Sequence, residues 1–521
     1  MSVSHSDKTP SITLRPLYRA AQVEELDRRT IEAGIEGFAL MQRAATAAWQ
    51  SLKARWPGVR RLTVLCGGGN NGGDGHVLAA LAGVAGLDVQ RIVLKSAESL
   101  EGDAARAAEM ATAAGVGIVP WRPGLDFTGE VVVDALLGTG LGGEVRGDIR
   151  DAIEAINASG LPVLAIDTPS GLAADTGAEL GVAVRATRTV TFIGDKIGLH
   201  TGRAPDLAGE VHFRALGVDA GGHQDIAPAA WLLNGELLPA LLPPRERDAH
   251  KGAMGHVLVV GGAPGFGGAG LLASEAAARL GAGKISLATA PEHVAACLTY
   301  RPEVMVHGVR GMADLGDLTE RADILVVGPG LGQGAWGQGM LQVSLMAGLP
   351  MVVDADGLNL LASRWAEERR DDWILTPHPG EAARLLGISA AEVETDRPAA
   401  VAELQRRRGG VIILKGAGTL VAGPMGLTVC PYGNPGMASG GMGDVLSGML
   451  GALLAQGVPL ESAASLGVVV HAMAADLAAR DGGERGLLAA DLASYARRLI
   501  NPEANVGIYP QAGSDNARAT R

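Results

Sequence analysis

Short runs of β-branched and aliphatic residues alternate with alanine-rich stretches along most of this chain, and that alternation limits the possible folds more than any other feature. In the first half the runs are RLTVLC (61–66), VVVDALLG (131–138) and LPVLAID (161–167), and each leads into glycine, aspartate or asparagine. Strands that alternate with helices form parallel sheets that are covered on both faces. The first half is therefore predicted to be an α/β domain.

The same alternation starts again in the second half, after a proline- and charge-rich stretch at 241–255. A chain of 521 residues is too long for one hydrophobic core. Residues 217–231 are rich in glycine, aspartate and proline, as is typical of a linker. We predict two three-layer α/β/α domains, over 15–220 and 228–500 with a boundary near 218–228, and a flexible tail at 501–521.

Composition excludes several classes of protein. The net charge of −12 argues against nucleic acid as a partner. The three cysteines, Cys66, Cys297 and Cys430, are far apart and form no CxxC pair, which indicates neither a disulfide framework nor a thiolate metal site. We see no signal sequence and no apolar run of the roughly 20 residues that a membrane span needs. We expect a cytoplasmic protein that does not bind membranes.

Polar side chains gather where three strands of the first domain end. In an open parallel sheet, ligands bind at these ends because loops and helix N-termini supply free N–H donors. The segment GGGNNGGDG follows the first strand, and its glycines let backbone amides approach a phosphate, while Asn70, Asn71 and Asp74 add polar groups. Asp134 and Asp167 end two further strands. Either aspartate alone could cap a helix, but together with Asn71 they predict a site for cation binding and acid–base chemistry.

The segments CGGGNNGGDG, VVDALLGTGLGG and AIDTPSG resemble the signature segments of NAD(P)HX epimerases, over about residues 15–218. The resemblance implies a Rossmann-like domain that interconverts the R and S hydrates at C6 of the reduced nicotinamide ring, with Asp167 handling the proton. Lys196 either assists or is a surface lysine near the sheet edge. A potassium ion is implied at Asn71, Asp134 and Ser170. The residues implied to bind the hydrate are Asn70, Asn71, Gly72, Gly73, Asp74, Gly138, Thr139, Gly140, Leu141, Gly142, Gly143, Glu144 and Asp167.

The strongest motif of the second domain is NPGMASGGMGDVLSG, at 434–448. Its glycines are predicted to open a helix whose N-terminal amides form an anion hole, with Asp444 beside it. Ribokinase-like enzymes use a similar GxGD arrangement with the aspartate as base. KGAGT, at 415–419, supplies a second loop for phosphate and adenine. His378 lies in a loop between two prolines, with Glu381 on the next helix.

Together with HKGxxG, GPGLG, DADGLN and TPHPGE, these segments resemble the ADP/ATP-dependent NAD(P)HX dehydratases, over about residues 228–500. The resemblance implies a ribokinase-like domain that uses Mg²⁺ and ADP or ATP, and the fused arrangement resembles bacterial members, in which ADP is usual. Ser439 and Met442 replace the threonines of the common family pattern. The residues implied to contact the hydrate are Ala269, Gly332, His378 and Asp444, and those implied to bind ADP or AMP are Lys415, Gly416, Ala417, Gly418, Thr419 and Gly443.

The implied chemistry couples phosphoryl transfer to elimination. A hydroxyl on C6 is a poor leaving group, whereas its phosphate ester leaves readily once the ring nitrogen pushes electrons toward it. Asp444 would deprotonate the hydroxyl, and the terminal phosphoryl of the nucleotide would then transfer. NADHX or NADPHX and an adenine nucleotide are thus the expected partners, and we also expect a homo-oligomer.

Two other functions compete with this interpretation. A ribokinase-like kinase of a small alcohol could use Asp444 equally well, but it leaves the complete first site unexplained. A non-enzymatic assembly scaffold would not need Asn71, Asp134 and Asp167. A dinucleotide oxidoreductase is excluded because neither domain has GxGxxG followed about 20 residues later by a ribose-binding acid.

Overall fold

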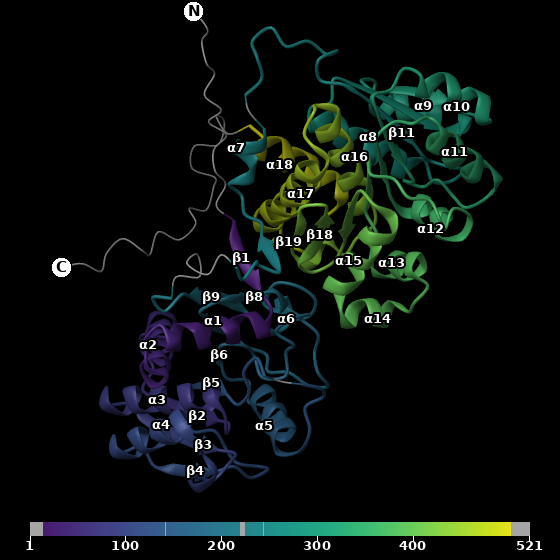
Figure 1. Cartoon of the computed structure of the whole chain (residues 1–521). Coiled ribbons are helices and arrows are strands. Elements are labelled where there is room, and N and C mark those ends of the chain that lie inside the picture. Colours follow the sequence, from purple (N-terminus) through teal and green to yellow (C-terminus); the bar gives the residue numbers. More distant parts are fainter. Residues whose placement is uncertain (1–13, 141, 219–224, 243, 502–521) are drawn as a thin grey trace, which may run out of the picture. The chain divides into compact units, whose positions relative to one another are not determined.

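The computed structural model of the chain describes residues 14–140, 142–218, 225–242 and 244–501 (Figure 1). Internal contacts divide the chain into two compact units, one over Pro16–Trp231 and a second that starts at Leu232 and includes Leu14 and Arg15. Each unit is a mixed α/β structure, as predicted. Leu141, most of the tail and part of the predicted linker lie outside the described residues.

The sheet of the first unit has seven parallel strands in the order β4-β3-β2-β5-β6-β7-β9. The chain begins in the middle, moves outward, and then returns to continue on the other side of β2. This is the strand order of a Rossmann fold, and its switch point lies between β2 and β5. The strands are β2 (Arg61–Cys66), β3 (Asp88–Val93), β4 (Ile118–Pro120), β5 (Val131–Ala135), β6 (Val163–Ile166), β7 (Arg188–Phe192) and β9 (Glu210–Arg214), and a separate parallel pair joins β1 (Arg15–Tyr18) to β8 (Asp195–Lys196).

Both faces of this sheet are covered, which explains the unbroken apolar character of its strands. Val64 and Cys66 of β2 belong to a core formed with the first four helices, whereas Leu65 belongs to a second core that includes Ile153 and Ile156 of α5. The helices are α1 (Ala20–Glu32), α2 (Gly37–Arg55), α3 (Asn70–Val84), α4 (Gly102–Ala113), α5 (Gly147–Ala158) and α6 (Ala204–Leu207), with short 3₁₀ turns at Ala97–Ser99 and Ile197–Leu199.

The second unit repeats the plan with a larger sheet. Seven parallel strands run in the order β13-β12-β11-β14-β15-β16-β17, and β18 and β19 extend them as antiparallel strands. Again the first strand lies inside the sheet, and the order reverses beside it. The strands are β11 (His256–Val260), β12 (Lys284–Thr289), β13 (Met305–Gly308), β14 (Ile324–Val327), β15 (Met351–Val353), β16 (Trp373–Leu375), β17 (Val411–Leu414), β18 (Thr419–Gly423) and β19 (Gly426–Cys430), and β10 (Ala230–Leu232) lies where the two units meet in the sequence.

Helices pack on this second sheet, and α8 and α16 make extensive contact with each other. Both follow glycine-rich passages that the sequence placed at strand or loop ends. The helices are α7 (Leu237–Leu241), α8 (Gly267–Arg279), α9 (Val294–Tyr300), α10 (Met312–Thr319), α11 (Ala335–Met346), α12 (Ala355–Arg364), α13 (Pro379–Leu386), α14 (Ala390–Thr395), α15 (Arg397–Arg408), α16 (Met442–Ala455), α17 (Leu460–Gly482) and α18 (Leu492–Leu499), with 3₁₀ turns at Pro291–His293, Pro435–Met437 and Ala489–Asp491.

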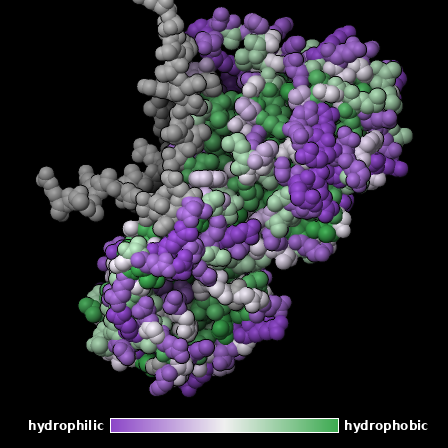
Figure 2. All heavy atoms as spheres, in the orientation of Figure 1, coloured by the Kyte–Doolittle hydropathy of each residue, from purple (hydrophilic) through white to green (hydrophobic). Residues whose placement is uncertain are grey.

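One helix, α17, is long and apolar enough by length and composition to cross a membrane, although Glu461, Asp476 and Arg480 interrupt its apolar sequence. However, 78% of its apolar window is buried inside the protein. It packs against α16 and α18, so its apolar residues belong to the core of the second unit. Hydrophilic residues are spread across the face shown in Figure 2.

Two candidate active sites

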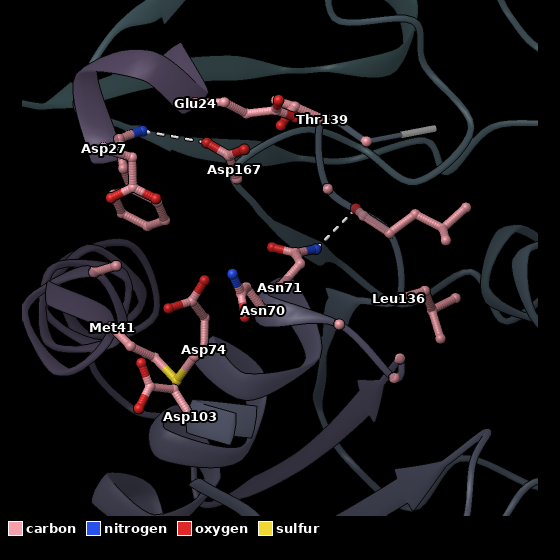
Figure 3. A pocket seen from close by; sticks show the side chains of 18 of the residues that line it. Glu24, Asp27, Met41, Asn70, Asn71, Asp74, Asp103, Leu136, Thr139 and Asp167 are labelled. Atoms are coloured by element: carbon pink, nitrogen blue, oxygen red, sulfur yellow. Dashed lines mark hydrogen bonds between the residues drawn. The ribbon is translucent and has the colours of Figure 1, made fainter. Parts of the chain in front are cut away.

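A cavity of about 920 Å³ lies at the carboxyl ends of the first sheet, beside the switch point between β2 and β5 (Figure 3). It brings together eight of the residues that the sequence predicted. Gly72 and Gly73 are buried in the first turn of α3, and Gly143 and Glu144 follow the loop, without lining the cavity. The predicted residues that line it are Asn70, Asn71, Asp74, Gly138, Thr139, Gly140, Gly142 and Asp167.

The loop from β2 to α3 packs so closely that side chains would not fit. A Cβ on Gly67 would lie 1.9 Å from the carbonyl oxygen of Leu136, and one on Gly72 would lie 2.1 Å from the carbonyl oxygen of Gly67. The N-cap of α3, Gly69, provides no side-chain hydrogen bond. The first amides of α3 are therefore available to an anionic ligand in the cavity.

Asp134 and Ser170 contact each other directly, and the Leu137 carbonyl accepts hydrogen bonds from both Ser170 and Asn71. Asp134 is fully buried in β5, and it accepts hydrogen bonds from the Ser170 hydroxyl (2.6 Å) and the Ser170 amide (2.8 Å). Burial raises the pKa of Asp134 to about 6, although the Ser170 hydrogen bonds oppose the shift. The Asn71 side chain donates to the Leu137 carbonyl at 2.8 Å, but its own buried oxygen has no partner among the described residues.

Asp167 follows β6 and is ion-paired with Lys196, whose side chain is only 1% exposed. Lys196 also donates to the Thr191 hydroxyl (2.9 Å) and the Phe192 carbonyl (3.1 Å). The interpretation of Lys196 as a surface lysine is therefore wrong. The backbone of Asp167 has a φ of 66°, a left-handed conformation that is uncommon outside glycine and is often found at functional sites.

Sequence reasoning missed the part that α1 contributes to this cavity. Asp27 and Glu24 of α1 line it opposite α3 (Figure 3). Lys95, which lies against Gly68, and Arg146, the N-cap of α5, also line it. Burial, together with the nearby Asp167, raises the pKa of Asp27. The α1 segment lacks the glycines that identified the other loops, so no local signal pointed to it.

In the second unit, α16 begins at Met442, and its N-cap Gly441 has a φ of 90°, so the predicted glycine-rich helix start is confirmed. Asp444 lies in the first turn. Burial and the nearby Asp354 raise the pKa of Asp444 to about 7, although Lys415 opposes the shift. A carboxyl with such a pKa can exchange protons near neutral pH.

Lys415 and Asp354 form a buried ion pair directly beside Gly443. The Lys415 ammonium donates to Asp354 at 2.7 Å and lies 3.8 Å from the Glu381 carboxylate, and the Ser447 hydroxyl donates to the other Asp354 oxygen at 2.8 Å. Burial alone would raise the pKa of Asp354, but Lys415 and these hydrogen bonds hold it below its usual value. A Cβ on Gly443 would lie 3.2 Å from both charged partners. The Lys415 ammonium is thus fixed next to Gly443, at the start of α16.

The remaining predicted residues of the second unit lie in loops and helix starts. His378 caps α13, where its Nδ1 accepts from the Gly380 amide at 3.0 Å, and its side chain is half exposed. The Gly332 amide donates to Asp356 at 2.9 Å, and Ala269 is in the first turn of α8. Gly416, Ala417, Gly418 and Thr419 form the turn from β17 to β18, closed by a 2.9 Å hydrogen bond from the Thr419 hydroxyl to the Gly416 carbonyl.

The two residues that depart from the family pattern differ in burial, since Ser439 is exposed and Met442 is buried. The Ser439 hydroxyl donates to the Leu487 carbonyl at 3.1 Å. Met442 is buried in the hydrophobic core of the second unit. Within the described ranges, the structure has no group of three or more histidine, cysteine, aspartate or glutamate residues placed to hold a metal ion.

Two α/β units, each with a glycine-rich helix start and buried ionisable groups at the carboxyl edge of its sheet, define a two-site enzyme of the nucleotide-binding class. Residues 37–198 match the family model of the YjeF-related protein N-terminus, and residues 257–498 match that of NAD(P)H-hydrate dehydratase. The chain belongs to the family of bifunctional NAD(P)H-hydrate repair enzymes, which confirms the resemblance inferred from its sequence.

Similar proteins span nearly the whole chain. The bifunctional NAD(P)H-hydrate repair enzyme Nnr of Coxiella burnetii is 50% identical over 93% of this chain and 99% of its own length. The enzyme of the same name from Escherichia coli is 44% identical over 95% of this chain and 96% of its own. Among solved structures, the ADP/ATP-dependent NAD(P)H-hydrate dehydratase of Bacillus subtilis is 30% identical, with a TM-score of 0.46, and covers 51% of this chain and 96% of its own.

Proposed function

We propose that residues 15–220 epimerise R- and S-NAD(P)HX and that residues 228–500 dehydrate the S form to NAD(P)H at the expense of ADP or ATP. The observation that carries the proposal is the presence of two separate sites that both contain a helix N-terminus with free amides and an ionisable aspartate. Fusion suits such a pair, because the epimerase converts the hydrate that the dehydratase cannot use into the one that it can.

In the first site, Asn71, Asp134 and Ser170 would hold K⁺. The fit rests on the buried Asn71 oxygen that has no partner among the described residues, and on the all-oxygen donor set. Bound there, K⁺ supplies positive charge beside the loops that contact the ligand. We assign the hydrate to the predicted residues of 70–74 and 138–144, with its pyrophosphate at the N-terminus of α3. Asp167 transfers a proton during the inversion at C6, and its ion pair with Lys196 holds the Asp167 carboxylate in place.

In the second site, Asp444 accepts the proton of the C6 hydroxyl as the terminal phosphoryl of the nucleotide transfers to that oxygen. Free amides at the start of α16 stabilise the transferring group. Both Asp354 oxygens are engaged by Lys415 and Ser447, and Asp444 serves as the base. Mg²⁺ would therefore be held mainly by the nucleotide phosphates, whose charge it would offset.

The remaining assignments follow the sequence. We place the hydrate against Ala269, Gly332, His378 and Asp444, and the adenine nucleotide against Lys415, Gly416, Ala417, Gly418, Thr419 and Gly443. Gly443 suits this role because a side chain there would press on the Asp354–Lys415 pair. We also propose a cytoplasmic location, which the three buried free thiols support. The homo-oligomer stays a prediction.

The test follows the absorbance of the reduced nicotinamide while the purified chain, with K⁺, Mg²⁺ and ADP or ATP, acts on a mixture of R- and S-NADHX. We expect recovery of NADH from both epimers, from the S form alone in Asp167→Ala, and from neither in Asp444→Ala. Absence of NADH with either nucleotide would overturn the proposal and favour a small-molecule kinase, which an ADP-release assay with candidate alcohols would detect.

A further inference from the structure

Acidic side chains outnumber basic ones in the lining of the cavity of the first unit. Two of its basic residues lie near the phosphate-binding loops: a Cβ on Gly68 would touch the Lys95 side chain at 2.7 Å, and Arg146 is the N-cap of α5. The third, Lys196, is paired with Asp167. The charged lining residues are six acids, Glu24, Asp27, Asp74, Asp103, Asp148 and Asp167, and three bases, Lys95, Arg146 and Lys196.

Asp27, Asp74 and Asp167 gather at one part of this cavity from three different elements. Figure 3 shows the carboxyl groups of Asp27 on α1 and Asp74 on α3 pointing into the space between the two helices, with Asp167 nearby after β6. Asp167 is ion-paired with Lys196. No hydrogen bond or ion pair to Asp27 or Asp74 is present among the described residues, so both carboxyls are open to a ligand.

Burial of like charges without a cation for each is costly, and carboxyls in this position retain protons. Burial raises the pKa of Asp74 well above its usual value, and the neighbouring Asp167 and Asp27 add to the shift. The site therefore combines a carboxylate paired with lysine and a carboxyl without a cation of its own. Such a difference in environment is how paired acid and base groups arise in active sites.

The acidic side chains of the cavity also affect which bond to C6 breaks during inversion. To invert C6, the enzyme must break either the C6–N1 bond, which opens the ring and leaves electrons on N1, or the C6–O bond, which leaves a ring cation. A protonated carboxyl such as Asp74 can donate its proton to the departing hydroxyl, and the nearby Asp167 carboxylate can stabilise the ring cation. This arrangement favours C6–O cleavage.

We propose that Asp74 and Asp167 invert C6 as an acid–base pair, with Asp74 protonating the hydroxyl as the C6–O bond breaks and Asp167 accepting a proton from the water that returns. The electron pair of C6–O goes to oxygen, which leaves as water, while the N1 lone pair forms N1=C6. Water then adds to the opposite face, and proton exchange between the two carboxyls restores the start. This inference deepens the proposed epimerase function and rests on it.

Oxygen exchange tests the route on the unmodified chain. R-NADHX is incubated with the full-length protein and K⁺ in oxygen-18 water, without nucleotide so that the dehydratase is silent, and the label in each epimer is followed by mass spectrometry. We expect one solvent oxygen in the hydrate for each inversion. Inversion with clearly less than one label per event would overturn the proposal and indicate ring opening. Absence of any catalysed inversion would overturn the epimerase function itself.

Substitution then tests the acid. Asp74→Asn should lower kcat for inversion about 100-fold with little change in KM, and Asp74→Glu should recover part of the rate, because general acid–base groups contribute about 10²–10⁴-fold. Asp151→Asn, an exposed acid on α5, is the matched control and should leave the rate unchanged. A rise in KM with kcat retained would show that Asp74 only binds, which would overturn its assignment as the acid.

Discussion

Both units contain a lysine paired with an aspartate at a strand end, but in the first unit the lysine is the buried partner and in the second unit the aspartate is. In the first unit Lys196 pairs with Asp167, which lines the cavity and is 17% exposed. In the second unit Lys415 pairs with Asp354, which is 2% exposed, and leaves Asp444 without an ion pair among the described residues. Lys196 therefore contacts the proposed reactive group, Asp167, directly. Lys415 instead pairs with Asp354, an aspartate near the proposed reactive group Asp444.

The largest difference should appear in stability. Lys415→Met leaves Asp354 buried and without its cation, which should cost about 3–5 kcal/mol. Lys196→Met should cost less, because water can reach Asp167. Hydrogen exchange of the buried amides in β15–β17 and in β6–β7 would measure each unit separately. Equal losses, or a larger loss for Lys196→Met, would contradict the distinction between the two pairs.

Lys196→Met should have a large effect on catalysis, although its effect on stability is the smaller of the two. Lys196→Met removes the group that positions Asp167, and we expect kcat for epimerisation to fall about 10²–10³-fold. Dehydration of S-NADHX by the same protein should be unchanged, which also shows that the second unit is intact. Lys53→Met, on the exposed side of α2, serves as the control. A pure KM effect would show that Lys196 binds the hydrate rather than positioning the carboxylate.

The pH dependence should distinguish the two sites further. Because Asp444 has a pKa of about 7, it is protonated below that pH and cannot accept a proton. The value of kcat/KM for dehydration should thus fall about tenfold per pH unit below about pH 7 and level off above it. The pKa of Glu381 is also raised to about 7, by burial. Persistence of the acid limb in Glu381→Gln would assign it to Asp444, and its disappearance would assign it to Glu381.

The last expected effect is on stability above neutral pH. The raised pKa means that the folded state binds the Asp444 proton more tightly than the unfolded state, so stability is lost as the pH rises from about 4 to about 7. Asp444→Asn removes that loss and should stabilise the second unit by about 1–4 kcal/mol at about pH 8, where the upper value corresponds to a shift of about three pKa units, with little change near pH 4. Thermal unfolding at both pH values would measure it. Stabilisation of the same size at both would show that the charge of Asp444 is not the cause.

The sequence was informative where function depends on glycine. The loops after β2 and before α16 could be predicted because they need glycine, at Gly67 for a close backbone approach and at Gly441 for a positive φ. The placement of Asp167 and Asp444 followed from these loops and from the rule that parallel strands present their carboxyl ends together. The alternation of strands and helices likewise predicted both sheets.

Partners that come from distant parts of the chain could not be predicted. The Asp354–Lys415 pair joins residues 61 positions apart, and no local pattern indicates that their side chains meet. Asp27 reaches the cavity because α1 packs near α3, which depends on tertiary packing. Lys196 looked like a surface residue because charged side chains are rarely buried without a partner, and that partner became visible only in the fold.

The apolar helix α17 also has a consequence for how the chain is made. Its burial depends on neighbours that include α18, which is synthesised afterwards. A nascent chain that has released Leu460–Gly482 but not Leu492–Leu499 therefore leaves the α18-facing side of an apolar helix uncovered, while α16 and the strands made earlier can already pack on the rest. Chains that end in this interval should aggregate or bind chaperones more than the full-length chain.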